Sequence, residues 1–198
     1  MINHKHKFIF IHLPSTGGTS IEHCFKKSAE PFTSALQDFD SPYICKEVEK
    51  HISPLIAKEI YSEYWHEYFK FSFVRNPWDW LSSLWHKGPR RRRGLSFSKW
   101  LLSPTLAPHE QQNMFDLKSE LSEMNFIGRF ENLQQDFNAV CNYINHAQTQ
   151  LPHKKSSNLK HYSEYYDTKT REIVAEIYAK DIDFFGYKFE NHKLNHDT

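Results

Sequence analysis

The amino-acid sequence predicts an α/β domain in which a mainly parallel sheet is flanked by helices. Three short runs of apolar, β-branched and aromatic residues, at 7–13, 69–74 and 125–130, have the length and composition of buried strands. Each run is followed by a stretch with apolar residues at helical spacing. Strands that alternate with helices are typical of parallel sheets, so these observations together predict the fold class.

Length and composition support one packed domain. The 198 residues are within the usual length of a single domain, so we expect one unit over 1–198, with a flexible N-terminal tail at 1–6 and a C-terminal tail at 190–198. Hydrophobic residues make up 39% and aromatic residues 16%, which is enough for a packed core. The formal net charge is only +1, which argues against a nucleic-acid partner.

The helices in the first half of the chain have clear start signals. The first strand runs into a Pro-Ser-Thr-Gly-Gly loop, and a helix is expected over 19–27. Its buried face is expected to carry Ile21, Cys24 and Phe25. A second helix is expected from Pro54 to about residue 65, because Ser53 is a typical N-cap and proline suits the first turn.

The later helices follow the same rules. Pro77 directly follows the second strand and its Arg-Asn, and it is expected to begin a helix that ends near Gly88. Another helix is expected over 131–145 after the third strand, and Asp167 is expected to cap the last one. The apolar stripe of that last helix is expected to contain Ile173, Val174, Ile177, Tyr178 and Ile182.

Cysteine usage and hydropathy bear on the compartment. Cys24, Cys45 and Cys141 are widely spaced and include no C-x-x-C pair, so we expect reduced thiols, no disulfide framework and no structural metal. No apolar run approaches the roughly 20 residues that span a bilayer. We therefore expect a cytoplasmic protein without a membrane span.

The loop after the first strand has the features of an anion site. Gly17 and Gly18 allow the backbone to curl and approach a ligand closely, and the following helix directs N–H groups and its positive dipole end toward it. Thr16, Thr19 and Ser20 offer hydroxyls. The spacing is not that of a Walker P-loop, and an ordinary glycine turn with a capping threonine is the alternative interpretation.

A second polar residue stands at the end of the second strand. Arg75 follows this strand at the expected carboxyl edge of the sheet, where open α/β folds bind ligands, and its planar fork suits a phosphate. Ser83, two helical turns further on, can add a hydroxyl. The alternative roles are an ion pair between Arg75 and Asp79 and an ordinary helix position for Ser83.

These two segments, FIHLPSTGGTS at 10–20 and FVRNPWD at 73–79, resemble the sulfotransferases that use 3′-phosphoadenosine 5′-phosphosulfate (PAPS). The similarity is closest to the carbohydrate branch, which includes uronyl 2-O-sulfotransferases and many bacterial members. Further matching segments are IGRFENL at 127–133, LPHKKSS at 151–157, YYD at 165–167 and DFFGYKF at 183–189.

The resemblance implies a fold similar to that of P-loop kinases and transfer of a sulfuryl group to a hydroxyl of a carbohydrate, without a metal. Its first loop would hold the 5′-phosphosulfate with Thr16, Gly17, Gly18, Thr19 and Ser20. Arg75 and Ser83 would hold the 3′-phosphate, and Lys155 and Ser157 would close over the nucleotide. The product would be adenosine 3′,5′-bisphosphate.

Sulfuryl transfer requires a base for the acceptor hydroxyl. His51, just before the helix start at Ser53, is the preferred candidate, because imidazole titrates near neutral pH and related sequences have a histidine at this place. His51 can alternatively pack beside that helix. His12 can touch the nucleotide or fill the core, and His66 is a weaker candidate.

Ser15 departs from the family pattern, which has a lysine that stabilises the leaving oxygen. Losing such a contact costs about 10²–10³ in rate. Lys155 or an arginine from 90–93 can substitute, catalysis can be slow, or the protein can bind nucleotide without turnover. A small-molecule kinase of related fold is a third reading.

The acceptor side of the site is less specified. The run of four arginines at 90–93 is either a solvated loop or an attractor for an anionic acceptor. Acceptor pockets in such folds are built from variable loops, here about 32–50 and 87–113. Trp78, Trp80, Trp85 and Trp100 are either core residues or a surface for stacking sugars.

Overall fold

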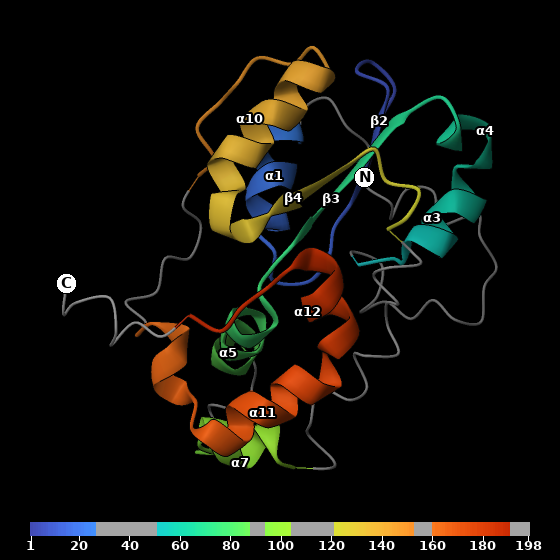
Figure 1. Cartoon of the computed structure of the whole chain (residues 1–198). Helices are drawn as coiled ribbons and strands as arrows, with labels where there is room; N and C mark the ends of the chain where they lie inside the picture. Colours follow the sequence, from blue (N-terminus) through green and yellow to red (C-terminus); the bar gives the residue numbers. More distant parts are fainter. Residues whose placement is uncertain (27–50, 88–93, 104–120, 153–159, 191–198) are drawn as a thin grey trace. The chain divides into compact units, whose positions relative to one another are not determined.

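The computed structural model describes residues 1–26, 51–87, 94–103, 121–152 and 160–190 (Figure 1). By its contacts the chain divides into two compact units. The first comprises Met1–Val74 and Ser119–Lys155, and the second comprises Arg75–Lys118 and Ser156–Thr198. A single domain over 1–198 stays a prediction.

The first unit contains a four-stranded sheet in the order β1-β2-β3-β4. Its strands are β1 (Ile2–Asn3), β2 (Phe8–Ile11), β3 (Phe69–Val74) and β4 (Phe126–Arg129). Strands β2, β3 and β4 run parallel, and β1 pairs antiparallel with β2. The expected α/β class with a mainly parallel sheet is therefore confirmed.

Aromatic side chains fill the space between the sheet and two helices, α1 (Gly18–Phe25) and α10 (Leu133–Tyr143). Phe10 and Phe71 are register partners whose ring centroids lie 4.9 Å apart. Phe25 of α1 and Phe137 of α10 meet at 5.6 Å, and both are fully buried. Figure 1 shows α1 and α10 together on one side of the strands, with α3 and α4 on the other.

Residues 1–6, expected as a flexible tail, instead contribute β1 to the sheet. Ile2 pairs with Ile9 and is 1% exposed, so the first residues of the chain lie in the core. Lys7 has a left-handed φ of 48° in the turn that joins β1 to β2. The expectation was wrong because a two-residue strand carries no periodicity of its own, although it covers an edge of β2 that would otherwise expose its backbone.

The helix expected from Pro54 to about residue 65 begins where predicted and is interrupted in the middle. Ser53 accepts a hydrogen bond from the N–H of Ile56 at 3.2 Å, which confirms it as the N-cap of α3 (Pro54–Ile60). Tyr61 leaves helical geometry, with φ −111° and ψ 33°, before α4 (Ser62–Trp65).

The second unit is helical over the residues that the structure describes. Its elements are α5 (Pro77–Lys87), α7 (Phe97–Leu101), the 3₁₀ helix η2 (Tyr162–Tyr165), α11 (Thr168–Ile177) and α12 (Ala179–Phe185). Trp78 of α5 donates to the carbonyl of Arg171 at 3.1 Å, and the Tyr166 hydroxyl donates to the carbonyl of Trp78 at 2.8 Å. These bonds join α5 to the chain around α11.

Three details of the second unit differ from expectation. The last helix ends at Ile177 and restarts at Ala179, because Tyr178 has φ −103° and ψ 23°. The helix α7, within the segment expected as an acceptor loop, was not predicted. Trp78 and Trp100 are 4% and 2% exposed, so these two tryptophans belong to the core and form no sugar-stacking surface.

No helix in the described ranges is long and apolar enough to cross a membrane. Cys24 and Cys141 are free thiols, and burial raises the pKa of Cys141 to about 11. Cys45 lies outside the described residues.

Candidate active site at the end of β2

The loop that joins β2 to α1 is curled by two left-handed residues. Ser15 has φ 59° and Gly17 has φ 86°. Between them Thr16 is buried, and its hydroxyl donates to the carbonyl of Leu13 at 2.8 Å. Backbone that alternates in this way turns its N–H groups toward one centre, which is a geometry suited to anions.

The two glycines of this loop are required by close contacts. A Cβ on Gly18 would lie 2.1 Å from Cδ2 and 2.3 Å from Nε2 of His12. A Cβ on Gly17 would lie 2.6 Å from Leu133, in addition to the strain of its positive φ. Gly17 is also the N-cap of α1, so no side chain caps the first turn, and the capping threonine weighed from the sequence is not found.

The hydroxyl groups of the loop are partly engaged in holding it together. The Ser20 side chain donates to the carbonyl of Pro152 at 2.8 Å, as Thr16 does to Leu13. Thr19 is exposed on the first turn of α1. Two of the hydroxyls are therefore bonded within the protein, and backbone N–H groups at the start of a helix are donors of the kind that bind phosphates.

Buried His12, at the end of β2, pairs with partly buried Glu22 of α1. The ring is 3% exposed, and its Nδ1 lies 2.7 Å from Oε1 of Glu22. Because an ionised carboxylate only accepts hydrogen bonds, Nδ1 of His12 donates. Sequence reasoning did not single out Glu22. The available signal was its spacing, one helical turn after Gly18, whose missing Cβ leaves room for the histidine ring.

His51, the expected base, lies directly against His12. Nδ1 of His51 is 3.0 Å from the backbone carbonyl of His12, and the two rings meet edge to face with centroids 4.5 Å apart. A carbonyl only accepts, so Nδ1 of His51 carries a proton and the basic lone pair of the neutral ring is on Nε2. His66, the weaker candidate, is exposed at the end of α4.

Arg75 and Ser83 belong to the second unit. Nε of Arg75 donates to Oδ2 of Asp79 at 2.7 Å, which is the ion pair weighed as the alternative role, and Ser83 is buried on α5. Their binding of a phosphate stays a prediction. Lys155, Ser157 and the arginines at 90–93 lie outside the described residues.

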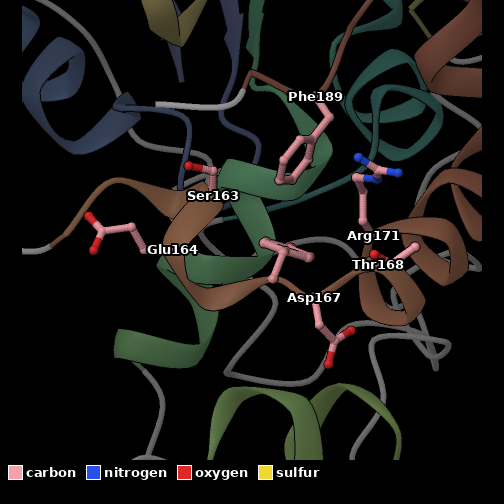
Figure 2. Close-up of a pocket in the computed structure, with 7 residues that line it drawn as sticks. Ser163, Glu164, Asp167, Thr168, Arg171 and Phe189 are labelled. Atoms are coloured by element: carbon pink, nitrogen blue, oxygen red, sulfur yellow. The ribbon is translucent and has the colours of Figure 1, made fainter. Parts of the chain in front are cut away.

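The second unit also has a cavity of about 350 Å³, which the sequence did not indicate. Figure 2 labels six of its lining residues and shows the guanidinium of Arg171 near the ring of Phe189; Cζ of Arg171 lies 5.6 Å from the centroid of that ring. Glu164 and Asp167 also line it, so its charge is mixed. Among the described residues, no group of His, Cys, Asp or Glu side chains is arranged to hold a metal ion.

The parallel sheet, with a glycine-rich turn between β2 and α1, defines an α/β protein of the strand–loop–helix kind. Comparison with protein families identifies the family: the model of the sulfotransferase family matches residues 1–188, and the chain belongs to this family. No curated protein matches the chain. The class of activity is therefore sulfotransfer.

Proposed function

We propose that the protein transfers a sulfuryl group from PAPS to a hydroxyl of a carbohydrate and releases adenosine 3′,5′-bisphosphate. The observation that carries this proposal is the β2–α1 loop, curled by left-handed Ser15 and Gly17 at the start of α1. The family match over residues 1–188 supports the reaction class. The sequence motifs support PAPS as the donor, and they support a place among the bacterial members of the carbohydrate branch.

The residues proposed for the donor fit its chemistry. Loop backbone N–H groups and the positive end of α1 suit the phosphosulfate, which is anionic. Arg75 and Ser83 are proposed for the 3′-phosphate, because a guanidinium binds phosphate in a bidentate manner. Lys155 and Ser157 are proposed to close over the nucleotide.

His51 is proposed as the base. When PAPS is bound, the acceptor oxygen bonds to sulfur, the bond from sulfur to the phosphate oxygen breaks, and that oxygen keeps the electron pair. Nε2 of His51 takes the proton that the acceptor hydroxyl loses. The bond from Nδ1 to the carbonyl of His12, at 3.0 Å, keeps Nε2 as the basic nitrogen.

The acceptor and the compartment are proposed on chemical grounds. The four arginines at 90–93 favour an anionic acceptor, such as an acidic or already sulfated glycan. Free Cys24 and Cys141 agree with a reducing compartment, and we propose the cytoplasm.

The donor site can be tested without knowing the acceptor. Calorimetric titration with adenosine 3′,5′-bisphosphate, AMP and Mg-ATP compares the affinity for a nucleotide that has a 3′-phosphate with the affinity for two that lack it. We expect preference for the bisphosphate, and about 10- to 100-fold weaker binding in Arg75→Ala. Arg171→Ala removes an exposed arginine of the same unit and is the matched control.

Three outcomes would contradict the proposal. Equal affinity for AMP and the bisphosphate would exclude a PAPS site, and Mg-dependent preference for ATP would favour a kinase. Because Ser15 brings no positive charge to the loop, bisphosphate binding without turnover, unchanged by Ser15→Lys, would favour a nucleotide-binding protein that is not an enzyme.

A further inference from the structure

The loop between β2 and α1 carries no lysine or arginine, and His12 stands at its start. Among residues 12–20, only His12 can be cationic, because the rest of the segment reads LPSTGGTS. If backbone N–H groups alone held the phosphosulfate, only the partial charges of peptide dipoles would stabilise the negative charge that develops on its leaving oxygen. A full charge beside such a site is worth more, since hydrogen bonds between charged groups are about twice as strong as neutral ones.

His12 is positioned at the loop. The Cδ2–Nε2 edge of its ring takes the space that a Cβ of Gly18 would fill, at 2.1 and 2.3 Å from that position. Gly18 is the first residue of α1, so this edge of the ring lies against the first turn of the helix, the end at which helices bind anions.

Glu22 provides the negative partner that favours a protonated ring. Its Oε1 lies 2.7 Å from Nδ1 of His12, and the two side chains are 23% and 4% exposed. A carboxylate in direct contact with a buried ring favours the imidazolium, because opposite charges at this distance attract. The buried amino group of Met1 also interacts electrostatically with Glu22.

His51 has a different environment although the two rings touch. Its Nδ1 is bound to the carbonyl of His12, which orients the ring and adds no negative charge. A cationic His12 with its ring centroid 4.5 Å away disfavours a second positive charge on His51. The geometry therefore separates the two histidines into one that holds a proton and one that remains able to accept one.

We propose that His12, held as an imidazolium by Glu22, supplies the positive charge for the anion bound at the β2–α1 loop, while neutral His51 acts as the base. This assignment rests on the proposed function. It makes His12 a further binding and catalytic residue and Glu22 a positioning residue. Nε2–H of His12 acts on the phosphate oxygen that gains the electron pair, and Nε2 of His51 receives the acceptor proton.

Binding tests the charge directly. Titration with adenosine 3′,5′-bisphosphate at pH 6 and pH 8 should give about 10- to 100-fold weaker binding at both values for His12→Gln. Glu22→Gln leaves His12 protonated less often, so it should weaken binding more at pH 8 than at pH 6. His23→Gln, an exposed neighbour of Glu22 on α1, is the matched control and should bind as the wild type does.

NMR of the histidine rings measures the titration midpoint of His12, which would not respond to the bisphosphate if the role of His12 were packing alone. In the wild type, the titration midpoint of His12 should rise when the bisphosphate binds, because the anion favours the imidazolium. In Glu22→Gln the midpoint should fall. This measurement uses the intact His12 and so stays decisive even if His12→Gln does not fold.

Charge replacement completes the test. Ser15→Lys brings a cation to the loop from another side chain. It should therefore raise the affinity for the bisphosphate by a larger factor in the His12→Gln background than in the wild type. A neutral His12 in the complex at pH 6–8, or bisphosphate binding unaffected by His12→Gln, would overturn this inference and leave the proposed function standing. Absence of a preference for the 3′-phosphate in the wild type would overturn the proposed function itself, together with the role that rests on it.

Discussion

At the scale of single residues, Gly18 shows how a side chain can be excluded by a buried neighbour. Alanine at this position would place Cβ 2.1 Å from the ring of His12, which is stiff, buried and tied to Glu22. We expect Gly18→Ala to lower the free energy of unfolding by about 1–3 kcal/mol through overpacking, measured by urea denaturation.

A double variant separates overpacking from any other effect of the alanine. His12→Ala removes the ring that the new Cβ would meet, so Gly18→Ala should cost less in the His12→Ala background than in the wild type. Equal costs in the two backgrounds would show that the contact with His12 is not what requires glycine.

At the scale of elements, side-chain caps set the starts of α3, α7 and α11. The N–H of Thr170 donates to Oδ1 of Asp167 at 2.7 Å, and the N–H of Asp167 donates to the Thr170 hydroxyl at 3.0 Å, which completes a capping box at α11. We expect Asp167→Ala to lower the free energy of unfolding by about 1 kcal/mol, and Asp167→Asn, which keeps a good cap, to cost less.

The same cap makes the stability of the folded state depend on pH. Hydrogen bonds from the backbone and then the side chain of Thr170 lower the pKa of Asp167, so the ionised form favours the folded state. The stability that it adds is present above the unfolded pKa of about 3.9 and is lost as the pH falls through the lower folded value. In urea denaturation, the stability advantage of the wild type over Asp167→Asn should therefore shrink from pH 7 to pH 3; a constant difference would contradict this.

At the scale of the whole molecule, the sheet should contain the most protected backbone. Strands β2 and β3 each pair on both sides, whereas β4 pairs with β3 alone among the described strands. We expect amides of Phe8–Ile11 and Phe69–Val74 to exchange with deuterium more slowly than those of Phe126–Arg129, by about an order of magnitude. Mass spectrometry of peptides measures this, and faster exchange in β2 than in β4 would contradict the topology.

Local patterns in the sequence were sufficient for most elements. The strands at 8–11, 69–74 and 126–129 and the caps at Ser53 and Asp167 were all predicted, because apolar runs and caps depend on neighbours within one helical turn or one strand. The glycine-rich loop was recognised for the same reason, since its residues are consecutive.

Contacts between distant segments decided the rest. The strand at Ile2–Asn3 exists because β2 offers it an edge, and the helix breaks at Tyr61 and Tyr178 interrupt runs that remain periodic in the sequence. The sequence by itself determined the fold class, the sulfotransferase motifs and His51 as a candidate. Only the tertiary structure joined His12 to Glu22 and to His51, because a strand end, a helix face and a segment 39 positions further along the chain come together there.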